Sequence, residues 1–186
     1  MARKRINVCL SGGAPGADMA WGVAARRRGH GVFHFSFPGH RTRAPLNERV
    51  MLSPAALRQA DGPLRRAARI LERRFSPNDG YRTSLLRRNW FQVRDSARLY
   101  AVGSLDRRGH VRGGTGWTVA LFLARAREAY LFDQRRRRWL AWRGAQAGWR
   151  PIARPPAPHG RWTGIGSRHL SRNGRRAIHD LMARLG

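Results

Sequence analysis

The sequence contains one cysteine, one lysine and few acidic residues, and it has no long apolar run. Cys9 alone excludes an internal disulfide framework and a zinc site built on cysteines. Apolar runs such as VALFLA are far shorter than the roughly 20 residues of a membrane helix, and the N-terminal segment lacks a signal-peptide core. The histidines show no metal-ligand spacing, so no metal site is predicted. We expect a soluble cytoplasmic protein with no membrane partner.

The scarcity of acid leaves a large positive charge. Only 10 Asp and Glu residues oppose 38 Lys and Arg residues, of which Lys4 is the one lysine, and the net charge is +28. A GC-rich codon preference explains arginine in place of lysine, but it does not explain the missing carboxylates. This charge attracts polyanions at low salt. Nucleic acid is therefore one expected partner, and a composition bias that the fold tolerates is the alternative.

Apolar runs typical of buried strands alternate with segments of helical periodicity, which predicts an α/β fold with a mostly parallel sheet. The length fits one domain over residues 1–186. Residues 133–160 are predicted to form a short hairpin and a Pro-rich linker. Strands are expected at 6–10, 32–37, 97–104, 129–134 and 161–167. Helices are expected at 14–28, at 53–74 with a break at Gly62-Pro63, at 81–96, within 113–128, and from a Ser171 cap to about Leu185.

Three of the predicted strand-to-helix turns are rich in glycine. They are SGGAPGAD (11–18), GGTGWT (113–118) and GIGSR (164–168). In an open parallel sheet such turns share the carboxyl edge of the strands, where these folds bind ligands, and a helix N-terminus there favours anions. One such turn could serve only tight packing. Three in one small domain predict a ligand site.

The three turns resemble those of the SLOG superfamily, which unites the DNA-processing protein A family with the Lonely Guy phosphoribohydrolases. SGGAPGAD is similar to that superfamily's SGGAxGAD turn, and RRNWFQVRDSARLYAVG followed by GGTGWT resembles its Arg-bearing helix, strand and PGGxGT loop. TGIGSRHLSRNGRRAIHDLM resembles the turn and helix that normally begin such domains. The resemblance implies a Rossmann-like three-layer sandwich, a nucleotide ligand and pairing of two copies through helices.

The order of these segments differs from the family. The element that usually comes first is here the last, so the chain resembles a circular permutant whose two termini lie close together. The family fold then implies a five-stranded sheet ordered 2-1-5-3-4, counted along this chain.

Ligand binding at the turns would give their residues the following roles, among which the arginine match comes from the resemblance. In the first turn, the Ser11 hydroxyl and the backbone of Gly12, Gly13 and Gly16 would hold a phosphate or a ribose edge. The second turn would hold another phosphate, and Arg88 or its neighbour Arg87 matches the arginine that faces this loop. Arg168 is a second candidate clamp. Asp18 either stabilises its own helix N-terminus or contacts a ribose hydroxyl. The remaining candidates for ligand binding are Gly113, Gly114, Thr115, Gly116, Gly164, Gly166 and Ser167.

The position that carries chemistry in the Lonely Guy enzymes differs here. Those enzymes place a glutamate four residues after the last loop glycine, in PGGxGTxxE, where this chain has Ala120, and Trp117 replaces the threonine. A phosphoribohydrolase-like N-glycosidase would need a carboxylate from elsewhere, and the candidates are Asp18 and Asp133. The sequence therefore favours a nucleotide binder or sensor over an enzyme.

A nucleic-acid-binding protein is the competing prediction. The segment RRRRWLAWRG interleaves tryptophans with arginines, as a stacking platform on a basic groove would. The alternative, which we favour, is that the tryptophans pack the hairpin against the sheet. The residues concerned are Arg135, Arg136, Arg137, Arg138, Trp139 and Trp142.

Overall fold

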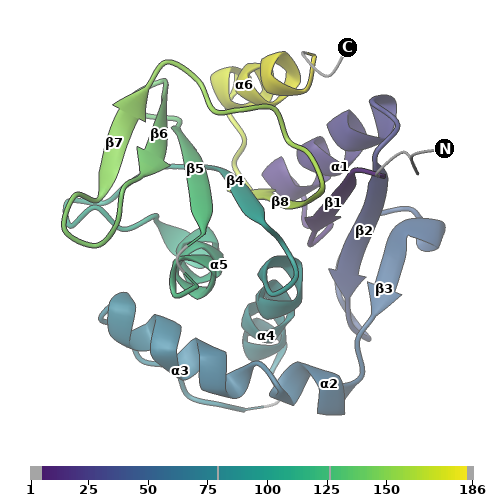
Figure 1. The fold of residues 1–186 in the computed structure, drawn as a ribbon. Helices are drawn as coiled ribbons and strands as arrows, with labels where there is room; N and C mark the ends of the chain where they lie inside the picture. The colour runs from purple at the N-terminus through teal and green to yellow at the C-terminus, as the bar shows by residue number, and fades with distance from the viewer. Residues whose placement is uncertain (1–5, 79, 126, 184–186) are drawn as a thin grey trace, which may run out of the picture.

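The computed structural model describes residues 6–78, 80–125 and 127–183, which form three layers (Figure 1). A single mixed sheet lies in the middle, with α1 and α6 on one face and α2 to α5 on the other. The sequence prediction of an α/β fold with a mostly parallel sheet is confirmed. Over the described ranges, no helix combines the length and the apolar content that crossing a bilayer requires.

The sheet contains more strands than predicted, in the order β3-β2-β1-β8-β4-β5-β6-β7. Its five central strands are the predicted ones, and their order β2-β1-β8-β4-β5 is the predicted 2-1-5-3-4. All neighbours from β3 to β5 are parallel, whereas β6 and β7 add to the edge in antiparallel fashion. The strands are β1 (Val8–Ser11), β2 (Gly31–Ser36), β3 (Arg49–Met51), β4 (Arg98–Gly103), β5 (Glu128–Asp133), β6 (Arg138–Trp142), β7 (Trp149–Ile152) and β8 (Arg161–Gly166).

Side-chain caps define where two of the helices begin. Ser53 accepts a hydrogen bond from the Ala56 amide, and Ser171 accepts one from the Gly174 amide, so both predicted caps are confirmed. The helices are α1 (Ala17–Arg27), α2 (Pro54–Arg58), α3 (Asp61–Ile70), α4 (Tyr81–Val93), α5 (Gly113–Leu123) and α6 (Arg172–Met182), and a short 3-10 turn covers Leu46–Glu48.

Three sequence predictions need correction. The loop after β2 contains the short strand β3, whose three residues carry too little pattern to be recognised. The helix expected over 53–74 is two helices, and the break falls at Gln59 and Ala60, just before Gly62. The predicted hairpin is present as β6 and β7. It is not separate from the sheet, however, because β6 pairs with the edge strand β5. The predicted closeness of the termini concerns residues 1–5 and 184–186, which lie outside the described ranges.

Three apolar clusters hold the layers together, and the smallest joins β1 and β2 to α2 and α4. On the α1 and α6 face, the rings of Trp21, Tyr100 and Trp162 are fully buried, and Trp21 meets Trp162 edge-on at 5.6 Å. Burial of each such ring contributes about 1.5–3 kcal/mol to stability. The opposite core joins α3, α4 and α5 to β4, β5 and β8. The clusters include residues next to the carboxyl ends of the central strands, such as Leu10, Val102 and Ile165, so the turns there start from packed positions.

Candidate functional site

A cavity of about 590 Å³ opens where the three glycine-rich turns meet. We call it the turn cavity. The first turn contributes Ala14 and Pro15, the second contributes Gly113 and Thr115, and the third contributes Gly166 and Arg168. The convergence that the sequence predicted is therefore observed. The full lining is Ala14, Pro15, Asp18, Arg73, Arg82, Leu85, Leu86, Arg88, Asn89, Gln92, Gly113, Gly114, Thr115, Trp117, Thr118, Ile165, Gly166, Arg168 and His169.

A buried ion pair lies at the base of this cavity. Arg88 of α4 places Nη1 3.4 Å from Oδ2 of Asp18 in α1, and both residues are buried. The other carboxylate oxygen, Oδ1, accepts a hydrogen bond of 3.0 Å from the Gly166 amide. Asp18 thus ties the first and third turns to α4. Arg87, the alternative candidate, instead forms two hydrogen bonds with Asp61 on α3.

Burial affects both members of the pair. It raises the pKa of the Asp18 carboxyl, and the Arg88 guanidinium and the Gly166 amide oppose that rise. Burial also lowers the pKa of Arg88, but an arginine starts from so high a value that it remains charged at neutral pH. The pair therefore presents a fixed positive group beside a carboxylate whose two oxygens are already hydrogen-bonded.

Two buried polar atoms at the cavity have no partner among the described residues. They are Nε of Arg88 and Oε1 of Gln92, and both side chains are more than nine-tenths buried. Gln92 donates a hydrogen bond through Nε2 to Oδ1 of Asn89, whereas its Oε1 accepts none from the described residues. An unsatisfied buried polar atom costs about 1–3 kcal/mol, which a bound ligand or water would relieve.

The N-terminus of α5 opens onto the same cavity. It has no side-chain cap and no acidic residue in its first turn. A Cβ added at Gly113 or Gly114 would meet no atom within 4 Å, so space lies directly in front of these residues. Arg73 reaches the loop and donates to the Gly113 carbonyl at 3.2 Å. Uncapped amides and the positive end of the helix dipole together favour an anion here.

The rest of the lining divides into a charged part and an apolar part. Asp18 is the one carboxylate among the described lining residues, whereas four arginines line the same cavity. The apolar part combines a ring, Trp117, with aliphatic side chains. A ligand that carries both negative charge and a flat apolar group would match this division. The arginines are Arg73, Arg82, Arg88 and Arg168, and the apolar residues are Leu85, Leu86, Trp117 and Ile165.

The first glycine turn does not form the phosphate cradle that the sequence suggested. Ser11 is fully buried and donates to the Gly164 carbonyl at 2.7 Å. A Cβ at Gly12 would lie 1.2 Å from Nη1 of Arg88, and one at Gly13 would lie 2.6 Å from Oγ1 of Thr42. A Cβ at Gly16 would meet the carbonyls of residues 167 and 168. These glycines allow close packing, and Ala14 and Pro15 line the cavity instead.

The start of α1 is also occupied from within the chain. The Ala17 amide donates to the Ser167 carbonyl at 3.0 Å, so one amide of this helix N-terminus is used to join the first turn to the third. This amide is therefore not free to bind an anion.

The other turn residues divide between packing and lining. Gly116 packs against the Val111 carbonyl, and Gly164 leaves room for Trp21, whose Cγ would be 2.5 Å from a Cβ. Gly166 lines the cavity and binds Asp18 through its amide. Ser167 accepts a hydrogen bond from the His169 amide through Oγ. The cavity is lined by Gly113, Gly114, Thr115 and Arg168, and ligand binding by these residues stays a prediction.

Asp133 does not belong to the site. It is fully buried, and its Oδ1 accepts hydrogen bonds from the amides of Arg135 and Arg136, at 2.9 and 3.2 Å. Its Oδ2 accepts one from Nη1 of Arg136 at 2.7 Å. The carboxylate therefore stabilises the turn between β5 and β6. The position of Asp133 at a strand end suggested that it would reach the ligand edge. Its carboxylate instead accepts hydrogen bonds from the turn that follows the strand, as Asp commonly does in turns.

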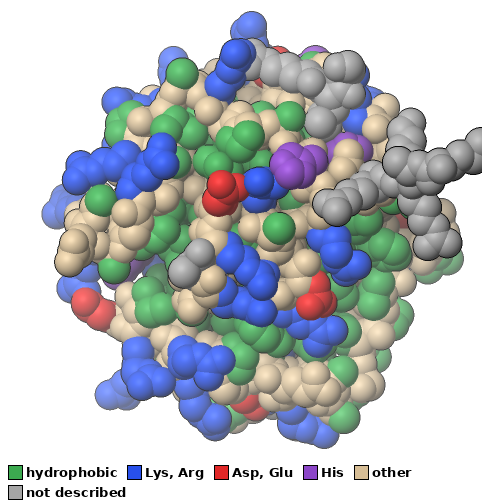
Figure 2. Space-filling model, viewed as in Figure 1, with side chains coloured by type: hydrophobic (Ala, Val, Ile, Leu, Met, Phe, Trp, Pro, Cys, Tyr) green, Lys and Arg blue, Asp and Glu red, His purple; other side chains and the backbone are tan. Residues whose placement is uncertain are grey.

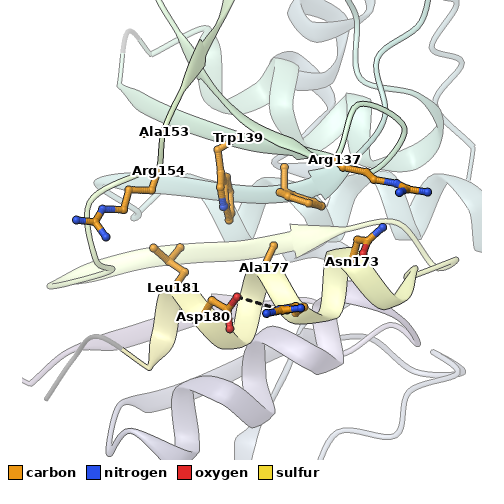
Figure 3. A pocket seen from close by; sticks show the side chains of 10 residues that line it. Arg137, Trp139, Ala153, Arg154, Asn173, Ala177, Asp180 and Leu181 are labelled. Carbon is orange, nitrogen blue, oxygen red and sulfur yellow. Dashed lines mark ion pairs between the residues drawn. The ribbon is translucent and has the colours of Figure 1, made fainter.

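The hairpin tryptophans pack inward, as the favoured interpretation predicted. Trp139 lies edge-on to Phe132 at 5.4 Å, and Trp142 lies edge-on to Trp149 at the same distance. Trp139 is only 8% exposed, at the wall of a cavity of about 560 Å³ between the hairpin and α6. Figure 3 shows Trp139 above Ala177 of α6, with Arg137 and Arg154 to either side. Arg135, Arg136, Arg137 and Arg138 are exposed.

Sequence reasoning missed part of α4. Arg82, Leu85, Asn89 and Gln92 all line the turn cavity. Their spacing of three, four and three residues puts them on one face of a helix, so the pattern could have been found by asking which polar residues share the face next to Arg88. Arg73 lies in the loop after α3, so helical spacing could not have predicted that it lines the cavity.

Comparisons of the chain with models of protein families, with curated proteins and with solved structures find no match.

Proposed function

We propose that the protein binds a nucleotide or a nucleotide-derived small molecule in the turn cavity. The observation that carries this proposal is the buried Arg88, whose Nε is unpartnered at the base of a cavity that three strand-to-helix turns enclose. A guanidinium held in this way is ready to bind phosphate without reorganisation. The resemblance of the three turns to the SLOG superfamily supports the same proposal.

The cavity favours a nucleotide over a bare phosphate. The uncapped amides of α5 and the four arginines suit one or more phosphate groups. Trp117, Leu85 and Leu86 provide an apolar surface for a base, and the unpartnered Oε1 of Gln92 is an acceptor for an amino group. One ligand with both features would engage the charged and apolar parts together.

Binding without cleavage fits the residues better than hydrolysis. Ala120, which stands where the Lonely Guy enzymes carry their glutamate, is buried in the core and does not line the turn cavity. Asp18 is the one described carboxylate in the lining, and both of its oxygens already accept hydrogen bonds. An N-glycosidase would need a free carboxylate at the sugar.

A substitution at Gly114 tests the proposal without disturbing the core. Gly114→Asp adds a negative charge in the first turn of α5, where a carboxylate favours the helix by several tenths of a kcal/mol. The variant should fold as well as wild type and lose nucleotide binding through charge repulsion. Gly114→Ala, which fills the same open space without charge, is the matched control. Isothermal titration with nucleoside mono-, di- and triphosphates gives the comparison, and equal affinities for Gly114→Asp and wild type would refute the proposal.

Nucleic-acid binding is a second candidate because so much arginine is exposed. Figure 2 shows blue side chains spread over the visible face with few red ones among them. The exposed run Arg135 to Arg138 offers phosphate contacts. Trp139 packs against Phe132 and Trp142 packs against Trp149, so neither ring is free to stack on a base. This surface is therefore better suited to contacts with the phosphate backbone of a nucleic acid than to stacking with its bases.

A further inference from the structure

A groove of about 860 Å³ runs between α1 and α6, and Pro15 lines both this groove and the turn cavity. These two helices pack side by side on one face of the sheet, and Figure 3 shows the yellow α6 between the hairpin and the purple α1. The floor of the groove is aliphatic. It includes Met19, Val23 and Ala24 of α1 and Ile178 and Met182 of α6.

Arginines surround this floor. Arg27 and Arg28 end α1, Arg172 and Arg175 begin α6, and Arg43 approaches from the loop after β2. Within the described ranges none of these five forms an ion pair, and no Asp or Glu lines the groove. Arg176, which also lines it, pairs with Asp180 at 3.5 Å. Arginines that line one groove without counter-charges raise the positive potential over it.

We propose that this groove docks an acidic amphipathic helix of a partner protein. An apolar floor between two helices is the usual receptor for the apolar face of a third helix, and methionine side chains adapt to such a face. Acidic residues beside that face would meet the arginine rim. Charge complementarity thus selects a segment with leucine-like residues at helical spacing and Asp or Glu on its flanks.

Two other occupants fit less well. A second copy of this chain, itself at +28, would bring the same arginines to the opposite side of a two-fold interface, where like charges repel. A single-stranded nucleic acid would find phosphate partners on the rim, but the described lining holds no Phe, Tyr or Trp on which bases stack. The aliphatic floor would then remain unused.

The test separates apolar docking from simple charge attraction. The probe is a fluorescein-labelled peptide of about 18 residues, ~27 Å long as a helix, with leucines on one face and glutamates beside them. A second peptide keeps every glutamate but has serine in place of leucine. Fluorescence anisotropy at near-physiological salt should show the leucine peptide binding at least about tenfold more tightly, because only it uses the floor. Equal binding of the two peptides would overturn the proposal.

Variants of the protein show whether the peptide binds at the groove. The double variant Arg27→Glu with Arg175→Glu reverses two exposed rim charges and should weaken the leucine peptide by about tenfold or more. Arg65→Glu with Arg66→Glu, on the exposed side of α3 in the opposite layer, makes the same charge change and should have an effect of less than about twofold. Equal losses in the two double variants would contradict a specific groove.

Nucleic acid is an explicit outcome of the same assay. If a short oligothymidylate lost affinity in the Arg27→Glu and Arg175→Glu protein but not in the α3 control, while the leucine peptide was unaffected, the groove would be a nucleic-acid site and the proposal would fail.

Circular dichroism of each variant confirms folding. Nucleotide titrations of the groove variant should match wild type, which keeps this inference independent of the turn cavity.

Discussion

Nη1 of Arg88 occupies the space where a side chain on Gly12 would begin. The two are so close that an added Cβ would lie 1.2 Å from that nitrogen, and Asp18 holds the guanidinium there. A glycine of the first turn is therefore required by Arg88, an arginine far away in the sequence. The glycine serves the ligand site indirectly, by making room for the cation at its base.

Gly12→Ala should consequently destabilise the protein. The methyl group would push Arg88 off Asp18 and leave two buried charges poorly paired, at a cost on the order of 3 kcal/mol. Urea denaturation measures the loss. Gly62→Ala, on α3 where a Cβ meets no atom within 4 Å, is the control and should be neutral or stabilise by about 0.5–1 kcal/mol. Equal midpoints for Gly12→Ala and wild type would show that Arg88 has another low-energy position.

The exposed arginines of the turn cavity should contribute to affinity without contributing to stability. Replacing Arg82 and Arg168 together by serine should weaken nucleotide binding by about tenfold or more, since each charge-assisted contact to phosphate is worth about 1.5–3 kcal/mol before solvent screening. The melting temperature should stay the same. Calorimetric titration of this variant beside Arg65→Ser with Arg66→Ser distinguishes local contacts from net charge. A matching loss in the α3 variant would count against the cavity.

His34 should make the protein less stable in mild acid. Burial lowers its pKa to about 4; Glu48 opposes this shift, whereas Arg26, Arg88 and Arg49 add to it. An unfolded histidine titrates near 6.5, so between these values the unfolded state binds more protons and stability falls as the pH falls. His34 then contributes about 2 kcal/mol at neutral pH that is lost by about pH 5.

The variant His34→Leu tests this assignment. Because it removes the titrating ring, the difference in unfolding free energy between about pH 7.5 and about pH 5 should shrink by roughly 2 kcal/mol. Denaturant midpoints at the two pH values provide the measurement. An unchanged difference would mean that other groups set the acid sensitivity.

The hairpin arginines should determine part of the salt dependence if single-stranded DNA binds there. Each lost phosphate contact reduces the slope of log affinity against log salt by about 0.7, so serine at Arg135, Arg137 and Arg138 should flatten it by about 2. Serine at Arg65, Arg66 and Arg69 is the control with equal charge removed. Fluorescence anisotropy over a salt series reports both slopes, and identical slopes would exclude the hairpin as the contact.

Local pattern was enough to predict the central sheet. The runs around Cys9, Tyr100 and Leu131 are apolar on both faces, as buried parallel strands are. A glycine turn directly marks the carboxyl end of the first of these strands. The short strand β3 and the pairing of β6 with β5 were not predicted, since three-residue strands and edge pairing depend on tertiary contacts.

The meeting of the three turns at one cavity follows from the sequence, but the detailed lining of the cavity does not. Which glycines face a ligand depends on packing between distant segments: Gly16 meets the carbonyls of residues 167 and 168, whereas Gly114 faces open space. From the sequence alone, Gly16 and Gly114 are both predicted to face a ligand. Asn89 and Gln92 could have been predicted from their shared helix face with Arg82, because that inference needs only helical geometry.

The most direct test of nucleotide binding is native mass spectrometry of the wild-type protein. A high-salt wash first removes polyanions held by the net charge of +28. The protein is then mixed with nucleoside mono-, di- and triphosphates of each common base, beside the Gly114→Asp variant. We predict a wild-type species that carries one nucleotide and that is missing from the variant. Wild-type protein that stays free of nucleotide across the whole panel would contradict the account.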